Sequence, residues 1–201
     1  MLVCFFLVNT GSLFAGTLSK GEFDDWYRKD VKGGIVTFEQ QFPNTYTAKV
    51  IANYFGKEIT GVIDEDIQNC KGLSIDGSNL TDLTGIEIFS KLENIGFGNN
   101  KIKTLPGSIG KLTNLQYMHA FNNEITSLPD SIGDLINLKI LDIKHNKLTN
   151  LPDSFKYFKN IQMEFVDFSN NLFPTNFAEQ LQSYGFTNYG NMMQDSLVLK
   201  Q

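Results

Sequence analysis

The side chains best suited to chemistry are His119, Asp142, Asp167 and Ser169, in the second half of the chain. A serine, a histidine and an aspartate can form the triad of a hydrolase, and a histidine with two carboxylates can hold a metal ion. Either arrangement needs direct contact, because a nucleophile must lie about 3 Å from its base. The positions of these four residues in the fold therefore decide what they can do.

A repeated sequence pattern determines those positions. Three consecutive segments follow the pattern L-x-x-[LIM]-x-[LIFA]-x-x-N-x-[IL]-x-x-L-P-x-S-[IF], and they begin at residues 92, 115 and 138. The asparagine at the ninth place recurs every 23 residues, as Asn100, Asn123 and Asn146. Segments with this pattern are identified as leucine-rich repeats, which stack into a solenoid around one continuous core.

Two less regular units flank these three repeats. The upstream unit has Ser78 at the ninth place, and the downstream unit has Asn171 there, after two extra residues near positions 160–162. The outer units of a solenoid are commonly atypical because they cover the ends of its core. We therefore expect an α/β fold, a leucine-rich repeat solenoid in which residues 70–173 form five units around a short curved parallel sheet.

The period assigns each repeat residue to one face of the sheet, because side chains alternate along a strand. Places four and six, such as Leu141 and Ile143, should point into the core. The amide at the ninth place, such as that of Asn123, should bond to buried backbone groups of the bend. Apolar residues from Leu80 to Ile95 are spaced by three, which predicts a 3₁₀ segment in the first unit and a change of repeat subtype after it.

Places three, five and seven form the exposed face of the sheet, which we call the concave face. Neighbouring strands lie about 4.8 Å apart, so His119 and Asp142 can touch, and the aspartate would then keep the proton on His119 to higher pH. Ser169 lies about 12 Å from His119, which excludes a triad. An ordinary ion pair is favoured over a weak metal site around His119, Asp142 and Asp167. We expect no catalytic residue, no metal and no cofactor.

Large apolar side chains gather on the concave face of the last three units. Such side chains on an exposed sheet face predict a contact patch for a protein partner. The alternative is that a terminal segment of the chain folds over them. The expected partner-binding residues are Tyr117, His119, Phe121, Ile140, Asp142, Lys144, Phe165 and Asp167.

Helices are predicted at both ends of the array. A helix over residues 44–55 would be capped by Asn44. Its apolar stripe would consist of Tyr46, Val50 and Tyr54, with Ile51 and Phe55 beside it.

Further short helices are expected over residues 23–31, 64–69 and 176–184, and residues 195–200 would form a strand or a tail. Residues 17–69 thus form the N-terminal segment and helical cap, and residues 174–201 form the C-terminal cap and tail.

The stretch from Phe42 to Phe89 resembles the start of internalin-type leucine-rich repeat proteins of Gram-positive bacteria. That family has a small helical cap followed by G-S-N-[IL]-T-D-L-T-G-I-E, which residues 77–87 match closely. The resemblance covers residues 36–173 and implies a secreted or surface-held protein whose concave face binds another protein. The later repeats carry L-P-x-S-I-G, which is more like cytoplasmic and plant-type arrays.

Composition narrows the possible partners. The 201 residues carry a formal net charge of −5, so phosphate backbones would repel the chain and nucleic acid is excluded as a partner. Two cysteines, Cys4 and Cys70, are too few for a disulfide framework or a cysteine-rich zinc site. Cys70 occupies a buried repeat place, where a thiol should be unreactive.

Residues 1–16 are mostly apolar and carry no charge. The segment is too short to span a bilayer and predicts a secretory signal peptide, with a buried N-terminal strand as the alternative. We expect a monomeric, non-catalytic, protein-binding module that is secreted or held at the cell surface. The alternative is a cytoplasmic scaffold that regulates an enzyme partner.

Overall fold

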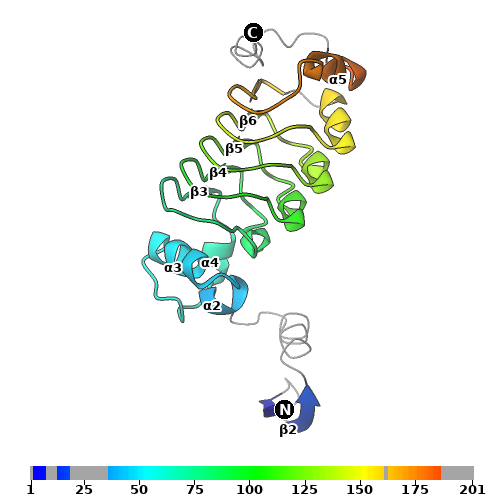
Figure 1. Cartoon of the computed structure of the whole chain (residues 1–201). Helices are drawn as coiled ribbons and strands as arrows, with labels where there is room; N and C mark the ends of the chain where they lie inside the picture. The colour runs from blue at the N-terminus through cyan, green and yellow to red at the C-terminus, as the bar shows by residue number, and fades with distance from the viewer. Residues whose placement is uncertain (1, 8–12, 19–35, 161–162, 187–201) are drawn as a thin grey trace. The chain divides into compact units, whose positions relative to one another are not determined.

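The computed structural model describes residues 2–7, 13–18, 36–160 and 163–186 of the chain (Figure 1). The chain divides into a small N-terminal unit, residues 1–36, and a main unit, residues 37–201. The helix predicted over residues 23–31, the strand predicted over residues 195–200 and the two extra residues predicted near 160–162 lie outside the described residues, wholly or in part.

The small unit contains one antiparallel pair of strands, β1 (Leu2–Leu7) and β2 (Leu13–Leu18). Leu2 lies opposite Leu18, and Leu7 lies opposite Leu13. Two parts of the predicted signal peptide are therefore in strand conformation, and export of the chain stays a prediction.

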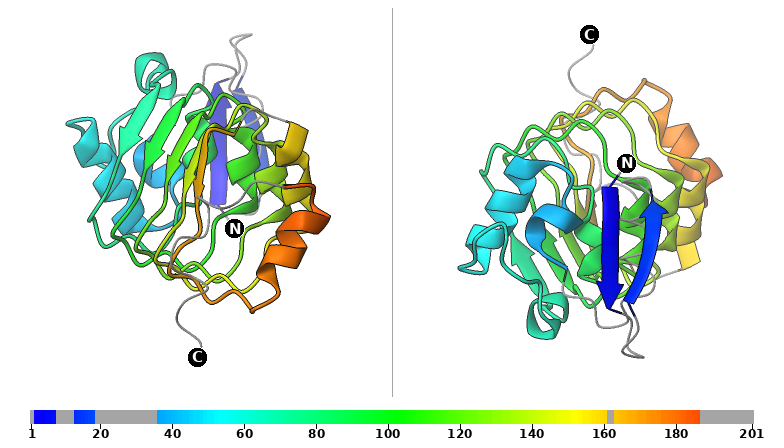
Figure 2. Two further views of the ribbon diagram at one scale, coloured as in Figure 1. Left: turned by 90° about the horizontal axis from the view of Figure 1, so that it is seen from above. Right: turned by 90° about the horizontal axis from the view of Figure 1, so that it is seen from below.

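The main unit is built on a five-stranded parallel sheet in which each strand pairs with the next one along the chain. The strands are β3 (Gly72–Ser74), β4 (Asn94–Gly96), β5 (Tyr117–His119), β6 (Ile140–Asp142) and β7 (Phe165–Asp167). Figure 2 shows the strands along one side of this unit and short helices along the other. The predicted five-unit leucine-rich repeat solenoid is confirmed.

The short helices opposite the sheet are all 3₁₀ helices. They are η1 (Ile86–Ile88), η2 (Gly107–Lys111), η3 (Asp130–Asp134) and η4 (Asp153–Asn160). The predicted 3₁₀ segment of the first unit is confirmed. The later units also have 3₁₀ helices, with five to eight residues against three in η1, and the change of repeat subtype stays a prediction. A 3₁₀ helix rises about 2 Å per residue, which is more than an α-helix. It therefore covers the side opposite the sheet with fewer residues, as a repeat of 23 residues requires.

The core is one column of apolar side chains that runs through all five units. The six residues predicted at places four and six of the regular repeats are fully buried, namely Ile95, Phe97, Met118, Ala120, Leu141 and Ile143. Ile109, Ile132 and Phe155 close the column from the 3₁₀ side. The predicted strand register is therefore confirmed.

The N-terminal cap consists of three short helices, α2 (Phe38–Gln41), α3 (Thr45–Tyr54) and α4 (Glu65–Gln68). Asn44 caps α3 by accepting hydrogen bonds from the backbone N–H groups of Tyr46 and Thr47, as predicted. The short turn predicted over residues 64–69 is α4. No pattern in the sequence indicated α2, which begins after Thr37.

The predicted contact face of α3 is right for Ile51, which is buried, and for Val50 and Phe55, which pack against the core, but wrong for the two tyrosines. The buried residues of the helix are Thr47, Ala48, Ile51 and Ala52, whereas Tyr46 and Tyr54 are about half exposed.

The two tyrosines of α3 lie at the margin of this contact. The Tyr46 hydroxyl donates to the carbonyl oxygen of Ser78 at 3.0 Å, and the Tyr54 hydroxyl donates to that of Gly72 at 3.4 Å. The tyrosines therefore bond to the outer edge of the first unit, which would otherwise be an open strand edge.

The C-terminal cap is helix α5 (Phe177–Ser183), which confirms the helix predicted over residues 176–184. Phe177 stacks on Phe173 with ring centroids 3.7 Å apart and meets Phe168 edge to face. These rings cover the apolar end of the last unit. Within the described residues, no helix is long and apolar enough to cross a bilayer.

Candidate functional site

The concave face of β5, β6 and β7 brings together the residues predicted to bind a partner. Tyr117 pairs in register with Ile140, and Ile140 pairs with Phe165. Two residues further along the same strands, His119, Asp142 and Asp167 form a second row. The first row is apolar and partly open to solvent, and Phe165 is 41% exposed.

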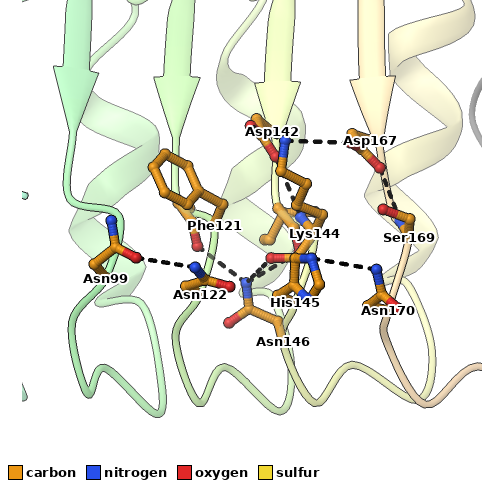
Figure 3. A network of polar contacts seen from close by, with 12 residues as sticks. Asn99, Phe121, Asn122, Asp142, Lys144, His145, Asn146, Asp167, Ser169 and Asn170 are labelled. Carbon is orange, nitrogen blue, oxygen red and sulfur yellow. Dashed lines mark hydrogen bonds and ion pairs between the residues drawn. The ribbon is translucent and has the colours of Figure 1, made fainter.

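Lys144 lies between the two aspartates of the second row (Figure 3). Its Nζ is 3.1 Å from Oδ2 of Asp142 and 3.6 Å from Oδ2 of Asp167. The hydrogen bond to Asp142, with the charges of both carboxylates, raises the pKa of Lys144 above its ordinary value. Asp142 is only 8% exposed, so a cation beside it is the expected partner for a buried carboxylate.

The predicted contact between His119 and Asp142 does not form. Asp142 pairs with Lys144, although His119 is its neighbour in register on the adjacent strand. The flexible lysine side chain brings its charge to both carboxylates at once.

The Phe121 side chain makes two contacts within the concave face, which its sequence position did not predict. Its ring lies on the backbone of Gly98, where an added Cβ would come within 2.6 Å of the ring. The ammonium of Lys144 lies 5.7 Å from the ring centroid, within the range of a cation–π interaction. Phe121 thus links the flat, glycine-containing part of the face to the charged part.

The first two strands present a small and polar surface. The Asp76 carboxylate accepts a hydrogen bond from the backbone N–H of Gly98 and one from the Ser74 hydroxyl at 2.8 Å. The same carboxylate lies over Gly96, where an added Cβ would come within 2.9 Å of it. The large apolar side chains of the concave face are therefore confined to its last three strands.

A row of residues at the eighth place was not recognised in the sequence. Four of them have left-handed backbone conformation with φ between 51° and 56° and are exposed, namely Asn99, Asn122, His145 and Asn170, and Gly77 takes this place in the first unit with a φ of 65°. Asn122 donates to Asn99 at 2.9 Å, and Asn170 contacts His145 at 3.3 Å (Figure 3). The recurring Asn–Asn pair in the sequence could have predicted this row, because asparagine tolerates the left-handed conformation better than most residues.

The arrangement offers little for covalent chemistry. Ser169 is buried, and its backbone N–H donates to Asp167 at 2.9 Å. Within the part of the chain that the structure describes, no three His, Cys, Asp or Glu side chains are grouped closely enough to hold a metal ion. Cys70 is half-buried, not fully buried as predicted. Its partial burial still raises the pKa of the thiol to about 11, so this thiol stays protonated at neutral pH.

A shallow polar groove of about 370 Å³ lies near the start of the strands. It is lined by Glu93, Asn114, Gln116, Asn137 and Lys139. The two asparagines donate to carbonyl oxygens of the preceding unit, at 2.8 Å and 2.7 Å. These amides join the repeats to one another, and the groove has few apolar walls for a ligand.

Comparisons with known proteins agree with this architecture. The family described as "Leucine Rich repeats (2 copies)" matches residues 113–157. No curated protein matches the sequence. The functional domain of InlJ from Listeria monocytogenes, described as including a cysteine ladder, is 27% identical, with a TM-score of 0.61 over 70% of this chain and 30% of that one.

A second similar structure is a leucine-rich repeat protein of Leptospira interrogans. It is 22% identical, with a TM-score of 0.52 over 59% of this chain and 36% of that one. This chain therefore spans about a third of the length of either structure.

Proposed function

We propose that this chain, which is a leucine-rich repeat protein with an internalin-like fold, binds another protein through its concave face and catalyses no reaction. Leucine-rich repeat proteins are typically protein-interaction modules of this kind. The observation that carries the proposal is the apolar row of Tyr117, Ile140 and Phe165 on three adjacent strands. Side chains of this kind, gathered on an exposed face, are a common basis of binding hot spots.

The rigidity of the face supports this role. The strands below it are held by the fully buried core and by the Asn123 and Asn146 amides. A rigid surface loses little conformational entropy when a partner covers it, so more of the contact energy is available for affinity.

The proposed location is outside the cell or at its surface. Two observations support it, the uncharged and largely apolar segment over residues 1–16 and the likeness to the InlJ domain of Listeria. Mass spectrometry of culture supernatant tests it, with an expected N-terminus near Gly16 or Thr17. Intact protein found only inside cells would favour the alternative, a cytoplasmic scaffold that regulates an enzyme partner.

A capture experiment tests the binding face. The chain is immobilised, incubated with surface proteins of candidate target cells and compared with the double variant Tyr117→Ala with Phe165→Ala. The matched control is Tyr157→Ala with Ile136→Ala, which removes two apolar side chains that are exposed and lie outside the concave face.

We expect the concave-face variant to lose a partner that the wild type and the control both retain, with unchanged circular dichroism in all three proteins. Full capture by the folded concave-face variant would place the binding surface elsewhere.

A further inference from the structure

The concave face carries more negative than positive charges. Three carboxylates, those of Asp76, Asp142 and Asp167, share this face with one ammonium, that of Lys144. Asp76 already accepts hydrogen bonds from the backbone of Gly98 and from a serine hydroxyl. These hydrogen bonds leave the charge of Asp76 in place but occupy its oxygens. The two adjacent aspartates of β6 and β7 share the single ammonium of Lys144, so one excess negative charge remains at that pair.

These two carboxylates keep capacity for a further hydrogen-bond donor. A carboxylate oxygen can accept two hydrogen bonds. Oδ1 of Asp142 accepts only a long 3.4 Å bond from the Lys144 backbone, and Oδ1 of Asp167 accepts one from Ser169 at 2.9 Å. The side chains are 12% and 19% exposed, so each has an edge that a partner can reach.

The apolar row runs parallel to this acidic pair. Tyr117, Ile140 and Phe165 precede the second row by two residues on the same strands, which is a distance of about 7 Å. A partner that covers the apolar row thus places its adjoining side chains beside Asp142 and Asp167. An acidic side chain there would be repelled, and a neutral one would leave the excess charge without a counterion.

We propose that the concave face recognises a cationic amphipathic segment of its protein partner, in which an arginine or lysine adjoins large apolar residues. The basic side chain lies against Asp167 and the open edge of Asp142, while the apolar residues cover Tyr117, Ile140 and Phe165. This inference rests on the proposed protein-binding function. The formal net charge of −5 on the whole chain adds long-range attraction for such a partner.

Selection from a displayed library of random dodecapeptides tests the inference without a known partner. The full chain is the bait, and the selected peptides are then measured against Asp142→Asn with Asp167→Asn. The matched control is Asp66→Asn with Asp130→Asn, which makes the same charge change at two exposed positions whose side chains form no ion pair in the described part of the chain.

We expect the enriched peptides to combine arginine or lysine with aromatic or aliphatic residues. Their affinity should fall about tenfold or more in the concave-face variant and stay within about twofold in the control. Raising the salt from about 0.05 M to about 0.5 M should weaken binding to the wild type more than binding to that variant. If the double variant does not fold, Asp167→Asn alone, which keeps the pair between Asp142 and Lys144, should weaken binding to a smaller degree.

The outcomes separate this inference from the proposed function. Neutral or acidic peptides that bind with equal affinity to the aspartate variant, but lose binding in Tyr117→Ala with Phe165→Ala, would overturn the cationic partner and leave the binding face intact. Peptides insensitive to both variants would overturn both proposals. A selection that enriches no peptide would overturn recognition of a short cationic segment.

Discussion

Nδ2 of Asn123 donates a hydrogen bond to the carbonyl oxygen of Phe97 at 3.0 Å, across a sequence separation of 26 residues. The same nitrogen donates to Ala120 within its own unit at 3.1 Å, and Oδ1 accepts from the backbone N–H of Ile102 at 3.1 Å. One amide thus satisfies buried backbone groups of two consecutive units. Asn146 does the same one unit later, where it donates to Ala120 and accepts from Ile125.

Replacing Asn123 by leucine should be strongly destabilising. Leucine has a similar size, but it leaves several buried backbone groups unpaired, each at a cost of about 1–3 kcal/mol. We expect the free energy of unfolding to fall by more than about 2 kcal/mol, measured by urea denaturation. Asn150→Leu is the control, because Asn150 is exposed. Equal stabilities of the two variants would show that the Asn123 amide is not required.

Leu141 and Ile140 are neighbours on β6 that point to opposite faces. Leu141 is fully buried and Ile140 is partly exposed. Leu141→Ala should lower the free energy of unfolding by about 2–5 kcal/mol, because burial is lost and a cavity is left. Ile140→Ala should lower it by less than about 1 kcal/mol. The reverse order in chemical denaturation would mean that the strand is shifted by one residue.

The effect of replacing Gly98 by alanine is predicted to depend on the Phe121 ring. A Cβ at position 98 would come within 2.6 Å of the Phe121 ring, so Gly98→Ala should displace the ring and cost about 1–3 kcal/mol of stability. In a Phe121→Ala background the same substitution should cost much less, because the ring is gone. A double-mutant cycle by thermal denaturation measures this coupling, and additive effects would contradict the contact.

Cys70 should react slowly in the folded chain. Burial raises the pKa of its thiol from 9.0 to about 11, so at pH 8 the thiolate fraction falls about 100-fold relative to the unfolded chain. Labelling with a chromogenic disulfide reagent in a Cys4→Ser background measures the rate, and urea-unfolded protein is the reference. Equal rates in folded and unfolded protein would contradict the burial of this thiol.

The same thiol gives a pH dependence of stability. Its pKa is raised by folding, so its contribution to stability is complete below pH 9 and is lost as the pH rises toward 11. In the same Cys4→Ser background, replacing Cys70 by alanine should therefore flatten the decline of the urea midpoint over this range. An unchanged decline would mean that groups other than the Cys70 thiol cause the loss of stability.

The sequence by itself determined the units, their register and the identity of the core. The pattern has a fixed period, and side chains alternate along a strand, so one correct assignment of Asn123 places every repeat residue inward or outward. The cap at Asn44 followed from local hydrogen bonding of its side chain to the next turn, which also needs no tertiary information. These features depend on residues within about one period of each other.

The tertiary structure alone decided which side chains meet across the strands. Lys144 is two residues from Asp142 and 23 from Asp167, and only the lateral packing of β6 and β7 brings all three together. The same holds for Phe121 on Gly98 and for the choice of the buried face of α3, which contains Ala48 and Ala52 rather than the tyrosines. A sequence pattern predicts the face on which a side chain lies. The choice among neighbours on that face depends on side-chain length, charge and the space left by glycine, and these act only once the strands lie side by side.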